Sequence, residues 1–216
     1  MSGIEAAVDG VKSTIYLNRP SWESMSNAYP AENITSSQFY PMVSKAWEKS
    51  VQKAPEHWEN TCATRMSYAL NRSGIKLGKA PSPGGTLIGD DKFNYWIRVA
   101  DLKIFLHQRF KGADESCDLT LLKDSDDDGV WEKRVEEAND KMLDLIHGRK
   151  GIIVFDVVGW GNATGHFTLW DGEDLVYVGP GDHNNPDTYE YYFWFTRVDD
   201  RGRIAQTKKI TFWELK

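Results

Sequence analysis

The sequence lacks the features that would place it among membrane-spanning or nucleic-acid-binding proteins. Its longest apolar run, residues 151–160, is interrupted by Asp156 and is too short to cross a bilayer. No basic stripe occurs, and a formal net charge of −6 argues against nucleic acid as the main partner. The first ten residues have neither the basic segment nor the long apolar core of a signal peptide. We therefore expect synthesis in the cytoplasm, with any export by a route other than general secretion.

Metal-binding and nucleotide-binding motifs are also missing. The five histidines are scattered, and neither a His-Glu-x-x-His motif nor a paired Cys-x-x-Cys occurs. No phosphate loop, dinucleotide fingerprint or Gly-x-Ser-x-Gly stands in the chain. Residues 124–129 match the opening of an EF-hand loop, but its twelfth position is Val135 instead of a bidentate acid. We expect a solvated acidic turn there, with calcium as the alternative, and we expect no resident metal or cofactor elsewhere.

Cysteine is scarce, and its two copies are not equivalent. Cys62 and Cys117 are too few for a disulfide framework, although a single bridge or two buried thiols are the alternatives. Cys117 lies in a stretch of polar residues that we read as a loop without an activating neighbour. Cys62 opens a segment with apolar residues at helical spacing, with Asn60 and Thr61 as N-cap candidates and Gly74 as the C-cap. The helix dipole should lower the pKa of a thiol at this position.

The chain has the length and composition of one soluble domain, residues 1–216, and its pattern predicts an α+β fold. Residues 1–35 are expected to be irregular, and residues 111–129 to be an acidic excursion from the core. Further helices are predicted from about Pro41 to Lys53, from Asp101 to Phe110 and from Trp131 to His147. Strands are predicted at 95–99, 152–158, 166–170, 175–178, 189–198 and 209–215.

The second informative segment surrounds His166. A glycine-rich loop, residues 159–165, precedes a strand that alternates like a half-buried one, and Gly165 would let a substrate or another backbone approach closely. Trp160 in this loop could form an aromatic wall of a cleft. The alternatives are a hairpin turn with a packed Trp160 and a histidine satisfied within the core. A cysteine that opens a helix, followed by a histidine on a later strand, is the order of a papain-like cysteine peptidase.

These stretches together resemble the fourth family of amidase effectors of the type VI secretion system. The resemblance runs through residues 60–74, 95–110, 151–158, 165–172 and 211–215. It implies an NlpC-type, papain-like fold in which the helix of the cysteine packs on an antiparallel sheet. The implied reaction is hydrolysis of the amide between D-γ-glutamate and meso-diaminopimelate in peptidoglycan stem peptides. Cys62 would be the nucleophile and His166 the general base, and the N-terminus of the cysteine helix would stabilise the oxyanion.

The family's third residue, an aspartate that orients the histidine, has no obvious counterpart. Counting across a turn at Asp171 places Tyr177 opposite His166, where no acid stands. Asp182 follows Gly-Pro-Gly, and a bulge could bring it back beside the histidine, so we assign the third role to Asp182. Asp171 and Asp174 are the alternatives, but both lie at the turn.

The resemblance also implies partners and a compartment. It predicts a cognate periplasmic immunity protein, tube or spike proteins of the secretion machine, and action in the periplasm of target bacteria. Two alternatives remain from the residues themselves. One is another Cys-His hydrolase or acyltransferase, and the other is a non-catalytic wall- or glycan-binding module in which the tryptophans matter and Cys62 does not.

Overall fold

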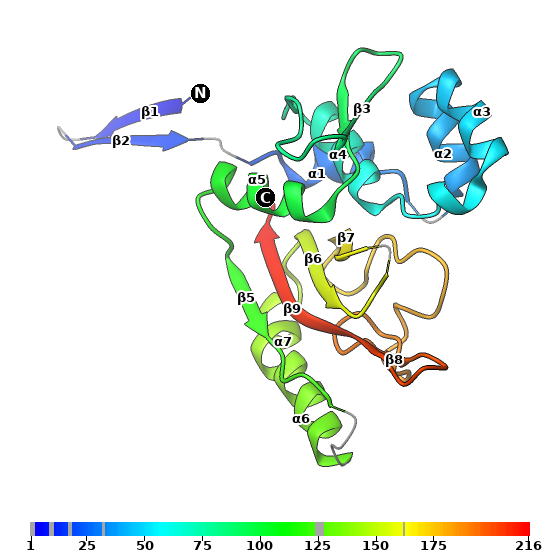
Figure 1. The fold of residues 1–216 in the computed structure, drawn as a ribbon. Helices are drawn as coiled ribbons and strands as arrows, with labels where there is room; N and C mark the ends of the chain where they lie inside the picture. The colour runs from blue at the N-terminus through cyan, green and yellow to red at the C-terminus, as the bar shows by residue number, and fades with distance from the viewer. Residues whose placement is uncertain (1–2, 9–10, 17–18, 32, 124–127, 162) are drawn as a thin grey trace.

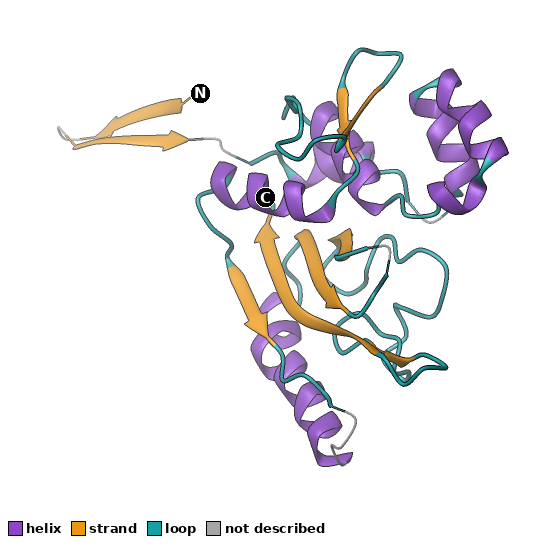
Figure 2. Cartoon of the chain, in the orientation of Figure 1, coloured by secondary structure: helices purple, strands orange, loops and turns teal. Residues whose placement is uncertain are grey.

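The computed structural model describes residues 3–8, 11–16, 19–31, 33–123, 128–161 and 163–216. Helices of the first half lie over one side of an antiparallel sheet, and a further helical segment lies against its other side (Figures 1 and 2). The sheet has five strands, in the order β5-β9-β6-β7 with β8 paired to β9. The mixed architecture with an antiparallel sheet confirms the predicted α+β class.

The beginning of the chain differs from the prediction. Residues 1–35 were expected to be irregular, but β1 (Gly3–Val8) and β2 (Val11–Tyr16) pair as an antiparallel hairpin, which extends away from the body in Figure 1. Helix α1 (Trp22–Ala28) follows, and its N-cap Ser21 accepts a hydrogen bond from the Ser24 N–H. A main-chain hydrogen bond of 2.9 Å from Trp22 to the Lys216 carbonyl joins the start of α1 to the end of the chain.

The helix predicted near Pro41 is in fact two helices. Helix α2 (Ser36–Val43) begins with a capping box from Thr35 and ends at Ser44, which is extended. Helix α3 (Lys45–Lys53) follows at once, and a 3₁₀ turn, η1 (Pro55–Trp58), begins at the proline that was expected to end the helix. The apolar side chains of α2 and α3 form a separate aromatic cluster with Tyr95.

The cysteine helix is confirmed. Helix α4 (Cys62–Arg72) begins after Thr61 and ends just before Gly74, whose φ of +90° suits glycine. A small hairpin follows, formed by β3 (Thr86–Ile88) and β4 (Asn94–Trp96), and then α5 (Val99–Arg109). The predicted strand near residue 95 is therefore shorter, and the following helix begins two residues earlier than expected.

Some of the predicted strands are present in the main sheet, and others are not strands in the structure. Strand β6 (Gly151–Val158) lies between β7 (Gly165–Trp170) and β9 (Ile204–Glu214), and β8 is Thr196–Val198. Residues 175–178 and 189–195 are not strands, and the first of these segments has a single β-bridge, from Leu175 to Trp170.

The acidic excursion also contains a strand of the sheet. Strand β5 (Glu115–Asp118) pairs with β9, with Cys117 opposite Ile210. Cys117 is therefore buried in an edge strand, at 3% exposure, and does not lie in a polar loop. The four residues of the EF-hand-like motif at 124–127 lie outside the described residues.

The helix predicted after the excursion is present with an irregularity. Helix α6 (Asp128–Ala138) continues through a π-helical turn, η2 (Asn139–Leu143), into α7 (Asp144–Ile146). Ala138, Met142 and Ile146 are fully buried, so this helical segment covers the second face of the sheet.

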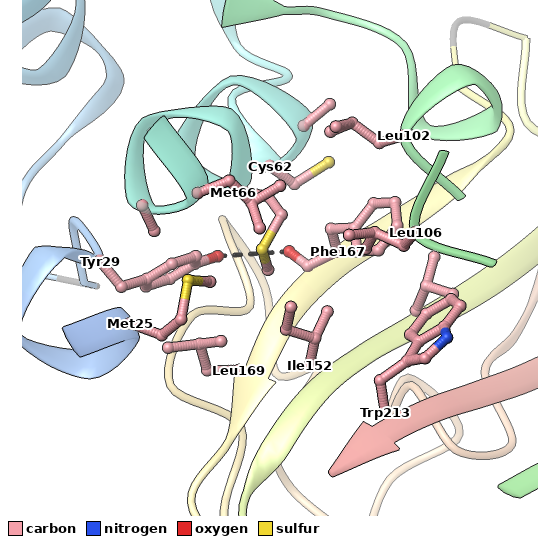
Figure 3. Close-up of a cluster of buried hydrophobic side chains, with 14 of the residues drawn as sticks. Met25, Tyr29, Cys62, Met66, Leu102, Leu106, Ile152, Phe167, Leu169 and Trp213 are labelled. Atoms are coloured by element: carbon pink, nitrogen blue, oxygen red, sulfur yellow. Dashed lines mark hydrogen bonds between the residues drawn. The ribbon is translucent and has the colours of Figure 1, made fainter. Parts of the chain in front are cut away.

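Two hydrophobic clusters lie on opposite faces of the sheet because successive strand residues point to opposite sides. On one face, the side chains of Ile152, Phe167, Leu169 and Trp213 form a cluster with side chains of α1, α4 and α5 (Figure 3). The other face carries Trp170, which packs on Phe193 with ring centroids 5.6 Å apart. Both faces of β6 are covered, which explains its nearly continuous apolar sequence.

We expect Gly165→Ala to destabilise the protein and to misplace the strand residue that follows. A Cβ at this position would overlap the Phe155 carbonyl oxygen of β6, so the strands would have to separate. A loss of about 1–3 kcal/mol in the free energy of unfolding should appear in urea denaturation. Gly161→Ala is the matched control because a Cβ there meets nothing within 4 Å. Equal stability of the two variants would contradict the packing role of Gly165.

Candidate active site

Cys62 lies where the helical layer meets the edge strand of the sheet. It is the first residue of α4, and α4 packs against β7, with Cys62 and Phe167 in the same buried cluster (Figure 3). The Cys62 sulfur receives hydrogen bonds from the backbone N–H groups of Phe167 and Ala63. Phe167 directly follows His166, so the thiol is held next to the histidine along the strand.

Burial, and not the helix dipole, dominates the ionisation of Cys62. The thiol is 8% exposed, and its desolvation raises the pKa. Hydrogen bonds from the backbone N–H of Phe167 and the nearby charge of Arg65 lower the pKa, but by less. The predicted lowering of the pKa is therefore wrong for the free protein, because the loss of hydration destabilises the thiolate more than the start of the helix stabilises it.

His166 projects from β7 toward the face opposite Phe167, and its ring is enclosed by aromatic side chains. It stacks on Tyr192 with ring centroids 4.4 Å apart and lies 5.6 Å from the ring of Tyr177. Its Nε2 is 2.9 Å from the main-chain carbonyl oxygen of Tyr177. A carbonyl can only accept, so Nε2 carries the proton and Nδ1 is left with a lone pair that can take up another.

The imidazole is neutral at physiological pH. Burial, with smaller effects of the nearby His183 and Arg65, lowers the pKa of His166 to about 3, while the hydrogen bond with the Tyr177 carbonyl acts in the opposite direction. With the Cys62 pKa raised, the free site therefore holds a neutral thiol and a neutral base instead of an ion pair.

The two residues share a cavity of about 270 Å³. Trp160 lines this cavity as predicted, and it packs on Phe195 with centroids 5.4 Å apart. Gly165 is absent from the lining, because it lies against the backbone of β6. Charged and polar side chains also reach the cavity, among them Glu59, Asn60, His183 and Arg197.

The structure does not bring Asp182 to His166. Asp182 is exposed, and its carbonyl accepts a hydrogen bond from Asn185 in a turn. Asp171 accepts from the N–H groups of Glu173 and Asp174 at the tip of the preceding turn. The position expected for an acid is occupied by the Tyr177 carbonyl, which corrects the assignment of Asp182.

Several residues of the site could not be assigned from the sequence. His183 donates from Nδ1 to the Glu190 carbonyl oxygen at 2.8 Å, and its ring stacks on Tyr192 with centroids 4.5 Å apart. Arg65 is fully buried beneath Tyr177, with its guanidinium carbon 4.1 Å from the ring centroid. Only the position of Tyr177 opposite His166 was visible in advance, from the residue count across the turn.

The described residues contain no group of three or more His, Cys, Asp or Glu side chains placed to hold a metal ion. Among these residues there is also no helix that is long and apolar enough to span a membrane.

Comparison with known proteins gives matches to one family of effectors. Residues 58–213 match the family model of type VI secretion system (T6SS) amidase effector protein 4, Tae4. The chain is similar to Tae4 of Enterobacter cloacae in a Tae4–Tai4 effector–immunity complex, at 26% identity and a TM-score of 0.59, over 92% of this chain and 99% of that one. It also shares the fold of Salmonella Typhimurium Tae4 in such a complex, at 23% identity and a TM-score of 0.61, over 92% and 99%. No curated protein sequence matches the chain.

We expect Asp182→Asn to leave turnover within about twofold of wild type, because its carboxylate does not reach His166. Asp171→Asn is the control for removing an exposed carboxylate beside the same segment. Steady-state rates of both variants test this expectation. A hundredfold or larger drop in turnover that is confined to Asp182→Asn would support Asp182 as the third residue of the site.

The stability of the protein should decrease as the pH falls from about 6.5 toward 3. In this window the unfolded chain binds a proton at His166 and the folded chain does not, so stability rises with pH. One such group contributes a slope of up to about 1.4 kcal/mol per pH unit. Urea denaturation at several pH values should show a shallower slope for His166→Gln than for wild type. His57→Gln, at a well-exposed histidine, should keep the wild-type slope; identical slopes for all three proteins would refute the neutral His166.

Proposed function

This chain belongs to the Tae4 family of type VI secretion system amidase effectors, and we propose that it cleaves peptidoglycan stem peptides with Cys62 as nucleophile and His166 as general base. The bond proposed is the amide between D-γ-glutamate and meso-diaminopimelate. The observation that carries the proposal is that these two side chains, from the start of α4 and from β7, line one cavity.

The protonation states define the first step. Nδ1 of His166 is the unprotonated ring nitrogen, so it accepts the proton of the Cys62 thiol as the sulfur attacks the amide carbonyl. Because both groups begin neutral, charge develops only as substrate enters and the reaction proceeds. The expelled amine takes the proton from the imidazolium, and an acyl-enzyme thioester remains. A water molecule, deprotonated by the same nitrogen, then hydrolyses the thioester and regenerates the thiol.

The start of α4 supplies donors for the oxyanion. The side chain of Thr61 makes no capping hydrogen bond to the helix. The first N–H groups of α4 therefore lack the side-chain acceptor that usually covers a helix start. Backbone hydrogen bonds from Cys62 and Ala63 lower the pKa of the Cys62 thiol, and this supports a role for these N–H groups near the reacting atom. The backbone N–H of Cys62 is our candidate for the main oxyanion donor.

We extend the proposal to the fold type and to the walls of the cleft. A helix that begins with the nucleophile and packs on an antiparallel strand bearing the base is the arrangement of an NlpC-type, papain-like peptidase. Trp160 provides an aromatic side to the cavity, against which an extended peptide can lie.

The biological setting proposed follows from the family. The protein would be delivered by type VI secretion, through tube or spike proteins, into the periplasm of rival bacteria. A cognate immunity protein would protect the producer, as suggested by the relatives solved as Tae4–Tai4 complexes.

Cys62→Ala should abolish cleavage of purified peptidoglycan while leaving the fold intact. The variant loses the only atom that can form the thioester, so we expect at least a thousandfold loss of rate. Mass spectrometry of the released fragments measures the rate and identifies the bond. Cys117→Ala is the matched control, because it removes the other buried thiol from a different cluster.

Two outcomes would separate this proposal from its alternatives. Wild-type cleavage by Cys62→Ala would exclude cysteine catalysis. Binding of peptidoglycan without cleavage by the wild-type protein would favour a wall-binding module. Expression with and without a periplasmic signal is the control for compartment: lysis is expected only with the signal, and only when Cys62 is present.

A further inference from the structure

Tyr177 contacts both halves of the site through different atoms. Its carbonyl oxygen lies 2.9 Å from His166 Nε2, and its N–H donates to Thr168 Oγ1 on the same strand at 2.9 Å. Its hydroxyl lies 2.8 Å from Thr61 Oγ1, in the residue directly before the nucleophile. Main-chain atoms thus fix Tyr177 to β7, and its side chain fixes it to the beginning of α4.

We propose that Tyr177 is the positioning residue of this site, holding His166 in the Nε2–H tautomer through its carbonyl and setting the start of α4 against β7 through its hydroxyl. This inference rests on the proposed function and replaces the acidic third residue with a neutral main-chain acceptor. Tyr177 does not touch the reacting atoms; it acts through His166 and Thr61.

The surroundings of Tyr177 make this position rigid. The guanidinium of Arg65 lies 4.1 Å from the centroid of the Tyr177 ring, and its Nε donates to Thr61 Oγ1 at 2.8 Å. Arg65 is itself fully buried and donates to the carbonyls of Pro30 and Ala31 at 2.7 and 3.0 Å. Thr61 is therefore held from two sides, which accounts for its failure to cap α4.

A main-chain carbonyl can replace only one of the two functions of a carboxylate beside a catalytic histidine. It fixes the tautomer and the ring orientation, because the acceptor must face an N–H. It brings no full negative charge to stabilise the imidazolium, which agrees with a histidine that is neutral in the free enzyme. Catalysis must then depend more strongly on the exact approach of Nδ1 to the sulfur, and this approach is what the Thr61–Tyr177 hydrogen bond sets.

Tyr177→Phe removes the hydroxyl and retains the ring and the carbonyl. We expect kcat on soluble stem peptide to fall about tenfold or more, with KM changed less than about twofold, because geometry is lost and substrate contacts are kept. Tyr95→Phe is the matched control: it removes another buried tyrosine hydroxyl, one bound to Asp91 in a separate cluster, and should reduce stability without lowering kcat. Thr61→Val should reproduce the loss, and Thr61→Ser should restore most of the rate.

A second measurement begins with the wild-type protein. Nitrogen-15 NMR of His166 in the wild-type protein should show a protonated Nε2 and an unprotonated Nδ1. In Tyr177→Phe the same tautomer should persist, because the carbonyl remains, while alkylation of Cys62 by iodoacetamide should change in rate. A dominant Nδ1–H tautomer in the wild type, or wild-type kcat and alkylation in Tyr177→Phe, would overturn the inference.

These measurements distinguish failure of the positioning role of Tyr177 from failure of the proposed function. If the wild type does not cleave peptidoglycan, the tautomer and the alkylation rate still test Tyr177. If Cys62→Ala is inactive while Tyr177→Phe behaves as wild type, the proposed function stands and the positioning role is refuted.

Discussion

The free edge of β7 is the constraint on which the rest of the site depends. β7 is the last strand of the main sheet. In the part of the chain that the structure describes, one row of its backbone groups has no strand partner apart from a single bridge. The protein satisfies this edge with other elements: the Tyr29 hydroxyl donates to the Phe167 carbonyl at 3.4 Å, and Val176 N–H donates to Leu169 at 2.9 Å. The Cys62 sulfur accepts from the Phe167 N–H. The packing of α4 on the edge of β7 therefore both covers this edge and brings the nucleophile beside the base.

Burial decides the electrostatic character of the site. Both Cys62 and His166 are less than one-tenth exposed, and desolvation opposes the charged form of each. A preformed thiolate–imidazolium pair would have to overcome both penalties, whereas a neutral pair incurs neither. The reactivity of the thiol is thus linked to proton transfer during attack. Donors at the start of α4 act where negative charge develops in the transition state, which is where such interactions increase the rate.

The sequence predicted those parts of the site that depend on local pattern. Helical periodicity with flanking cap residues located Cys62 at the start of a helix, and alternation after a glycine located His166 on a strand. The third position was mispredicted, because the search was confined to carboxylates and a main-chain acceptor has no sequence signature. β5 was missed because only Cys117 and its immediate neighbours enter the sheet from a polar segment, and pairing with the distant β9 creates that strand. The N-terminal hairpin was missed although Asp9-Gly10 is a hairpin dipeptide between two alternating segments.

The buried Arg65 explains why the segment before α2 is needed for a site built on α4 and β7. A guanidinium removed from water requires acceptors for its donors, and here they are supplied by the Thr61 hydroxyl and by the carbonyls of Pro30, Ala31 and Ile34. Tyr177 covers one face of the cation. Removing any one of these partners would leave a buried charge partly unsatisfied. The carbonyls of Pro30, Ala31 and Ile34 must therefore pack together with α4 and Tyr177. This single cation therefore couples the folding of the helical layer to the alignment of Cys62 and His166.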